Sequence, residues 1–154
     1  IAKLIEETFW NEQIGAYTDR NRFTNELSNC LTPASFMPLY IKTASKDRAE
    51  KLAKIAADER VFNSNMPTVT YDNPEYSQNY WRGPLWLNIA YFAAKGLKNY
   101  GFSGADDIKE NILFLIDGIK EGIFENYDTK NKKGLCCCGF SWSAVFIIEF
   151  ILDW

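Results

Sequence analysis

The chain has 154 residues and a formal net charge of −3, and it contains no histidine. An acidic balance with scattered Lys and Arg argues against nucleic acid as a partner, and no apolar run reaches the roughly 20 residues that a membrane span needs. The absence of histidine excludes Ser-His and Cys-His nucleophile pairs and histidine-ligated metals within this chain. We therefore expect neither a cofactor nor a metal.

The first part of the chain predicts one helical hairpin. Residues 2–10 form a short amphipathic helix, which keeps one side in water. A long loop follows over residues 14–31. Residues 31–44 are apolar nearly all round, with Thr32 as the expected N-cap and Pro33 at the first helical position. A helix without a polar side belongs in the interior.

The middle of the chain repeats this arrangement. Residues 46–58 are amphipathic and predict a second outer helix. The loop over residues 60–82 leads into an apolar helix over 83–101, which opens with Pro84 and stops at Gly101. This segment predicts a second inner helix.

The last part shows the same order most clearly. Residues 105–122 predict an outer helix whose apolar face consists of Ile108, Ile112, Leu115, Ile116 and Ile119. A loop over 122–140 precedes an apolar segment, 140–153, which opens at Ser141 and predicts the third inner helix.

The unit of outer helix, long loop and inner helix thus occurs three times. The links around Ser45 and Ser103 hold only a few residues, so the three long loops are expected to meet at one rim. Two of the loops have a similar sequence pattern, since FWNEQIGAYTDRN and GIFENYDTKNKKG each contain a Tyr and an Asp shortly after a helix. The pattern predicts an all-α fold of helical hairpins that forms about half of an (α/α)6 barrel.

Half a barrel leaves the apolar side of its inner helices uncovered, which soluble monomers rarely tolerate. The chain also starts at Ile1 rather than at methionine and is apolar up to its last residue. We therefore expect a piece of a longer protein, in which missing sequence or a second copy of the chain covers this face.

Aromatic side chains concentrate where the long loops join the inner helices. They are Tyr80, Trp81 and Trp86, with Arg82 among them, in NYWRGPLW, and Phe140 and Trp142 at the third junction. Aromatic faces that stack on sugar C–H groups, with a guanidinium for the hydroxyls, would suit a saccharide pocket. The alternative is that Trp81 and Trp86 wedge the helix into the core while Arg82 pairs with a carboxylate.

Only carboxylates are left to carry acid–base chemistry. Glu125 lies in a rim loop between Phe124 and Tyr127, where partial burial among aromatic rings suits a group that takes a proton from water. Tyr127 is a further candidate for the pocket. Asp128 fits a structural role in the loop backbone. The other rim carboxylates are more often solvated or loop-capping than catalytic, and they are Asp19, Glu26, Asp72 and Glu75.

The cysteines are Cys30 and the run Cys136, Cys137 and Cys138. Adjacent cysteines do not easily turn three sulfurs onto one metal, and no zinc spacing is present. Free thiols in a reducing compartment are favoured, which predicts a cytoplasmic location.

The order NYWRGPLW, GLKNYG, ENYD and GFSWSA is similar to the C-terminal part of the catalytic domain in glycoside hydrolase family 63. That family includes glucosidases that trim mannosyl-oligosaccharides and mannosylglycerate hydrolases, and trehalases are more distant relatives. FWNEQIGAYTDR also fits, so the resemblance covers essentially residues 1–154. None of these motifs alone identifies the family, but their order and spacing along the chain are fairly specific for it.

This resemblance implies a six-hairpin α/α barrel that hydrolyses glycosidic bonds of oligosaccharides or disaccharides with inversion. The glutamate matching Glu125 is the general base, and residues matching Trp81, Arg82, Trp86 and Trp142 line the pocket. The family's general acid lies in an upstream ESGxD-type motif that this chain lacks, so the fragment alone is expected to be inactive. Asn126, Ser143 and the triple cysteine depart from the common pattern.

Two other classes stay open from the residues alone. One is a non-catalytic helical domain that binds a saccharide or a protein through its aromatic rim. The other is a different α/α barrel activity, such as a phosphorylase or an epimerase; epimerases usually need histidine, which this chain lacks.

Overall fold

The structure is a computed structural model that describes all of residues 1–154. Its α-helices are α1 (Ala2–Thr8), α2 (Met37–Tyr40), α3 (Lys46–Ala57), α4 (Leu87–Asn99), α5 (Gly104–Gly118) and α6 (Ser141–Leu152). Two 3-10 turns accompany them, η1 (Pro33–Phe36) and η2 (Tyr80–Arg82). None of these helices combines the length and the apolar character needed to cross a bilayer.

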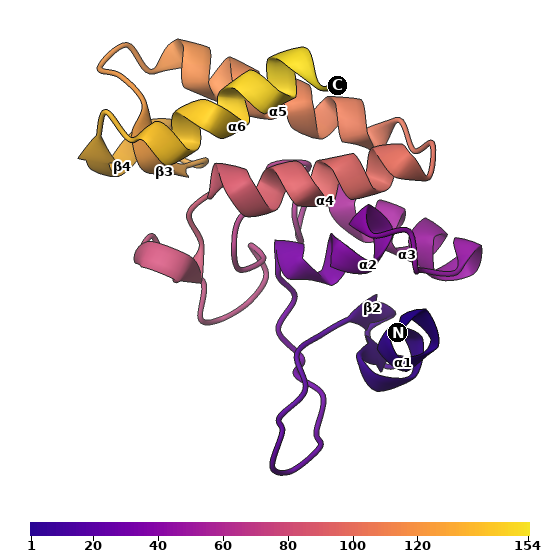
Figure 1. Cartoon of the computed structure of the whole chain (residues 1–154). Helices are drawn as coiled ribbons and strands as arrows, with labels where there is room; N and C mark the ends of the chain where they lie inside the picture. Colours follow the sequence, from indigo (N-terminus) through magenta and orange to yellow (C-terminus); the bar gives the residue numbers. More distant parts are fainter.

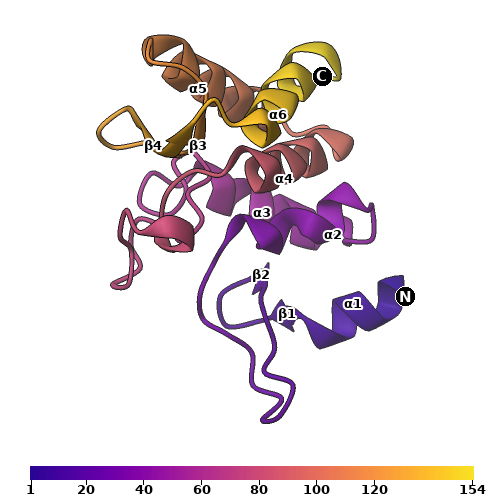
Figure 2. The same ribbon diagram turned by 60° about the vertical axis from the view of Figure 1, so that its left-hand side comes forward.

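The helices form an inner and an outer set, as the sequence pattern predicts. Helix α4 lies in the middle and contacts α2, α5 and α6 (Figure 1). In both views α2, α4 and α6 run in the same direction, so that their N-terminal ends point to one side of the molecule (Figures 1 and 2). The long loops after α3 and α5 reach the molecule's edge on that side, as expected, whereas the first long loop, after β2, extends to the bottom of both views (Figures 1 and 2).

The expected all-α fold is confirmed only in part, because the loops carry short strands. Two antiparallel hairpins are present, with strands β1 (Trp10–Asn11), β2 (Ala16–Tyr17), β3 (Phe124–Asp128) and β4 (Lys133–Cys138). Strands of two residues are too short to show alternation, and residues 126–128 of β3 are buried on both faces. The fold is therefore helical with two small β-hairpins rather than purely all-α.

The first inner helix is much shorter than the expected span 31–44. Its N-cap is confirmed, because Thr32 Oγ1 accepts a hydrogen bond from the Ala34 N–H at 3.2 Å. The chain then makes one 3-10 turn and one α-turn and leaves the helix after Tyr40. Lys42 adopts a left-handed φ of 58°, and the Thr43 N–H returns to the Pro38 carbonyl, which closes the helix end.

The second inner helix also begins later than predicted, at Leu87 rather than at Pro84. Leu85 is extended and exchanges two backbone hydrogen bonds with Tyr127, at 2.8 and 3.0 Å. These bonds tie β3 to the start of α4. The helix start is therefore decided by a pairing between segments that lie 42 residues apart in sequence.

Small side chains on α4 allow the neighbouring helices to pack closely around it. Ala90, Ala93 and Ala94 are fully buried on it, and Gly96 faces the backbone of the first inner helix. A Cβ atom at Gly96 would lie 2.9 Å from the Tyr40 nitrogen and 3.0 Å from the Leu39 Cβ. The two inner helices therefore approach at a distance that only glycine permits.

One side of the inner layer is left uncovered, as the half-barrel pattern predicts. Helix α6 has an apolar character nearly all round, yet much of it faces solvent. Its exposed side chains include Val145, Ile148, Ile151 and Leu152. An apolar face of this kind is typical of a surface that another segment or subunit covers.

Candidate active site

Three tryptophans from three separate segments meet at the rim. Trp81 from η2 stacks on Trp86, with ring centroids 3.9 Å apart and planes 12° from parallel. Trp142, at the start of α6, meets Trp86 edge to face at 6.3 Å. Trp86 is only 2% exposed, whereas Trp81 and Trp142 are 40% and 45% exposed. The rim thus carries two accessible rings on one buried ring.

The loop that carries Trp81 is held by close backbone contacts. A Cβ atom at Gly83 would lie 2.2 Å from the Ser77 carbonyl oxygen, so only glycine fits there. The Gly83 N–H donates to Thr68 Oγ1 at 3.1 Å, and the Trp86 indole N–H donates to the Tyr80 carbonyl at 3.2 Å. These bonds fix Trp81 above Trp86.

Glu125 lies on β3 beside this cluster. Glu125 is half-buried and lines, together with Trp86, Trp142 and Asn88, a narrow crevice that is too tight to hold a water molecule in this chain. The Glu125 carbonyl accepts a hydrogen bond from Ser143 Oγ at 3.2 Å, which joins β3 to the first turn of α6. The residue predicted to act as a base therefore lies beside two rings of the predicted aromatic wall.

The other predicted pocket residues differ in their placement. Tyr80 and Arg82 are exposed, and Phe140 is half-buried beside Trp142, with ring centroids 6.3 Å apart. Arg82 forms no salt bridge, so the structure does not support its pairing with a carboxylate. Trp86, in contrast, does wedge the start of α4 into the interior, as the structural alternative predicted.

The expected substrate contact of Tyr127 is wrong. Its side chain is completely buried in the core, and its hydroxyl accepts a hydrogen bond from the Phe124 N–H at 3.0 Å. Burial raises the pKa of the Tyr127 phenol above its ordinary value. Tyr127 therefore holds β3 in place from below and does not face a ligand.

Asp128 has the structural role that the sequence suggested. It is buried, and its carboxylate accepts hydrogen bonds from the backbone N–H groups of Lys130 and Asn131 and from the Asn131 side chain. This pattern is an Asx turn that shapes the β3–β4 connection. The remaining rim carboxylates are exposed, and they are Asp19, Glu26, Asp72 and Glu75.

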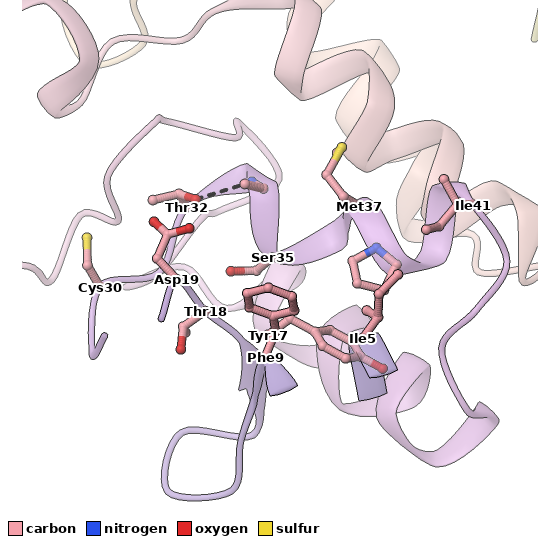
Figure 3. Close-up of a pocket in the computed structure, with 12 residues that line it drawn as sticks. Ile5, Phe9, Tyr17, Thr18, Asp19, Cys30, Thr32, Ser35, Met37 and Ile41 are labelled. Atoms are coloured by element: carbon pink, nitrogen blue, oxygen red, sulfur yellow. Dashed lines mark hydrogen bonds between the residues drawn. The ribbon is translucent and has the colours of Figure 1, made fainter. Parts of the chain in front are cut away.

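A second cavity, of about 230 Å³, was not anticipated from the sequence. It lies between α1, the loop after β2 and the first inner helix (Figure 3). Thr18, Asp19 and Ser35 line one part, while Ile5 and Ile41 line another. No residue of this cavity lines the Glu125 crevice. The sequence analysis did not recognise the short strand β2, which is buried and ends two residues before Asp19; this strand would have pointed to the cavity.

Helical hairpins whose rim gathers aromatic rings around a carboxylate are features of helical glycosidase domains. A family model described as the mannosylglycerate hydrolase MGH1-like glycoside hydrolase domain matches residues 1–143, and the chain belongs to this family.

Relatives in sequence agree with this assignment. The chain is 33% identical over 147 residues to a mannosylglycerate hydrolase of Thermus thermophilus, a match that covers 92% of this chain and 34% of that protein. It is 36% identical over 131 residues to a periplasmic trehalase of Salmonella agona, over 84% of this chain and 21% of the trehalase. The chain thus spans about a third or less of these relatives.

Solved structures show the same fold. A GH63 mannosylglycerate hydrolase from Thermus thermophilus in complex with Tris and D-glycerate matches with a TM-score of 0.84 at 32% identity, over 94% of this chain and 36% of that one. Its complex with glucose matches with the same TM-score at 33% identity, over 94% and 37%. The neutral trehalase Nth1 from Saccharomyces cerevisiae, 20% identical, shares the fold with a TM-score of 0.77 over 97% of this chain and 28% of its own.

Proposed function

We propose that this chain supplies the general base and part of the sugar pocket of an inverting glycoside hydrolase. The observation that carries the proposal is that Glu125 lines one crevice with Trp86 and Trp142. The substrate is a small glycoside such as a disaccharide or a sugar joined to a hydroxy acid. Relatives named mannosylglycerate hydrolase favour the second kind.

The reaction divides between two carboxyl groups. A protonated acid donates to the leaving oxygen, while Glu125 takes a proton from a water molecule on the opposite face of the sugar. Inverting enzymes hold these groups roughly 6.5 to 9.5 Å apart to admit that water. Trp81 and Trp142 offer apolar faces to the sugar ring, and the Arg82 guanidinium binds its hydroxyl or carboxylate groups.

We propose that the second carboxyl group comes from another part of the protein, because the ESGxD-type motif that carries it in family 63 is not found in these 154 residues. We propose that the chain is the C-terminal half of an (α/α)6 barrel, because it contains three units of outer and inner helix and its motifs resemble the C-terminal part of the family 63 domain; it covers about 36% of a solved relative. The other half would bring the general acid to the rim and cover the exposed face of α6. The chain alone would therefore not turn over substrate. A cytoplasmic location stays an expectation that rests on the free thiols.

The test is Glu125→Gln in the full-length protein. Loss of a general base should lower kcat by on the order of a hundredfold or more, with little change in KM. Glu75→Gln is the matched control, because Glu75 is an exposed rim carboxylate, and it should leave kcat unchanged. Near-parental kcat in Glu125→Gln would contradict the assignment.

Two further measurements define the reaction. Proton NMR of the first-formed product should show the anomer of inverted configuration; a retained anomer would exclude the base role of Glu125. Assays with mannosylglycerate, trehalose and glucose oligosaccharides should rank the substrates. Saturable saccharide binding without release of reducing sugar would favour a non-catalytic binding domain instead.

A further inference from the structure

The β3–β4 hairpin places two thiols directly across from Glu125. Phe124 pairs with Cys138 and Asn126 pairs with Leu135, so one residue of β3 faces two residues of β4. Those two residues are Cys136 and Cys137, and both are exposed. An extra residue on one strand is a β-bulge, a feature that often lies beside active sites.

The Cys136 sulfur holds a buried side chain next to Glu125. Asn126 is completely buried, and its Nδ2 donates a hydrogen bond to Cys136 Sγ at 3.4 Å. The Oδ1 atom of Asn126 has no hydrogen-bond partner. The sulfur is therefore the only polar contact that the Asn126 side chain makes. Losing such a contact is costly, because a buried amide without a partner pays its full desolvation penalty.

The other two cysteines of the run lack this connection. Cys138 Sγ donates to the Glu121 carbonyl at 3.5 Å, at the far end of the hairpin beside Gly122. The Cys137 thiol is exposed, like those of its neighbours, and makes no hydrogen bond within the protein. Cys136 also adopts a left-handed φ of 62°, which sets its backbone apart from the flanking strand. Three neighbouring thiols thus differ in what each one touches.

We propose that Cys136 is a site of reversible thiol modification by small disulfides, and that the adduct inhibits the enzyme by moving β3. In this exchange the Cys136 thiolate attacks one sulfur of the disulfide, a new S–S bond forms, and the original S–S bond breaks. The other half leaves as a thiolate and takes up the proton that Cys136 has released. The effect on turnover rests on the proposed function of Glu125.

The inhibition follows from geometry. An adduct adds bulk at the sulfur that Asn126 contacts, and in this proposal the bulk displaces the sulfur and leaves the buried Nδ2 without its partner. Glu125 precedes Asn126 on the same strand, so its carboxylate shifts relative to Trp86 and Trp142. A displacement of about 1 Å is enough to lower turnover by one to two orders of magnitude.

The experiment treats the full-length protein with 2-hydroxyethyl disulfide and compares it with Cys136→Ser, Cys137→Ser and Cys138→Ser. A serine hydroxyl accepts the Asn126 hydrogen bond, so Cys136→Ser should fold and turn over substrate like the parent. Treatment should lower kcat on the order of tenfold in the parent, in Cys137→Ser and in Cys138→Ser, and dithiothreitol should restore it. Treated Cys136→Ser should keep its activity.

Peptide mass spectrometry and melting curves make the test independent of catalysis. The adduct should be found on Cys136, and treatment should lower the melting temperature of every variant except Cys136→Ser. Absence of an adduct on Cys136, or equal inhibition and equal melting shifts in Cys136→Ser, would overturn the proposal. If no substrate is turned over at all, the function of Glu125 fails, while the adduct and the melting shift still decide the role of Cys136.

Discussion

Trp81 lies flat on Trp86, with 3.9 Å between ring centroids and 12° between planes. Trp86 is buried and anchored by its indole N–H, whereas the outer face of Trp81 is open to solvent. One buried ring thus supports one exposed ring. This platform presents a flat apolar surface without the entropy cost of ordering a free side chain.

Replacing the exposed ring should weaken substrate binding and leave the fold intact. We expect Trp81→Ala in the full-length protein to raise KM about fivefold, since one aromatic stacking contact contributes roughly 1 kcal/mol. Steady-state kinetics and a melting curve measure the two effects. The control is Phe114→Ala, because Phe114 is an exposed aromatic residue on α5 that does not line the Glu125 crevice. Equal KM changes in both variants would refute a binding role for Trp81.

Because α4 lies close to the first inner helix, we expect an added methyl group to destabilise the fold at Gly96 but not at Gly118. Gly96→Ala should lower the free energy of unfolding by about 1–3 kcal/mol, because its Cβ would lie 2.9 Å from the Tyr40 backbone nitrogen and 3.0 Å from the Leu39 Cβ. Gly118→Ala is the matched control at the end of α5, where nothing lies within 4 Å. It should be neutral or stabilise by up to about 1 kcal/mol. Denaturant titration of the full-length variants distinguishes the two, and equal effects would contradict the packing.

The loop before η2 should make stability sensitive to alkaline pH. Burial, followed by the charges of Tyr71 and Asp128, raises the pKa of Tyr76 from 10.0 to about 12. The unfolded chain thus loses its Tyr76 proton near pH 10, while the folded chain keeps it until about pH 12. The contribution of Tyr76 is complete below pH 10 and declines as the pH rises toward 12.

Tyr76→Phe removes the titrating group and keeps the ring. We expect its denaturant midpoint to fall less between pH 10 and pH 12 than that of the parent. A decline remains, because Tyr17 and Tyr91 also have a raised pKa, chiefly through burial. The control is Tyr80→Phe, an exposed tyrosine of the rim. If Tyr76→Phe declines as steeply as the parent, burial of this phenol is not the cause.

The helices α3, α5 and α6 were predictable because each carries its own local signal. Periodic apolar residues such as Ile108, Ile112 and Leu115 mark α5, and they are buried in the structure. The cap at Thr32 was predictable because a side-chain oxygen satisfies a backbone N–H only a few residues away. The resemblance to family 63 added the proposed role of Glu125 as the general base, whereas spacing alone left Glu125 among several carboxylates.

The hairpins, the late start of α4 and the burial of Tyr127 had no local signal. Each depends on a partner distant in sequence: Leu85 pairs with Tyr127, and Ser143 bonds the Glu125 carbonyl. Residue type cannot tell Trp86 from Trp81, because both are large amphipathic rings, yet one is buried and the other exposed. The bulge that brings Cys136 and Cys137 opposite Glu125 depends on the register of two strands.

The amino-acid sequence by itself determined the order of the helices and the family, because periodicity, capping and motif order depend on neighbouring residues. Only the tertiary structure decided which rings face solvent, where β3 runs and what Asn126 touches. The physical reason is that burial and hydrogen-bond partners across the chain are properties of packing, which brings together segments that no local pattern relates.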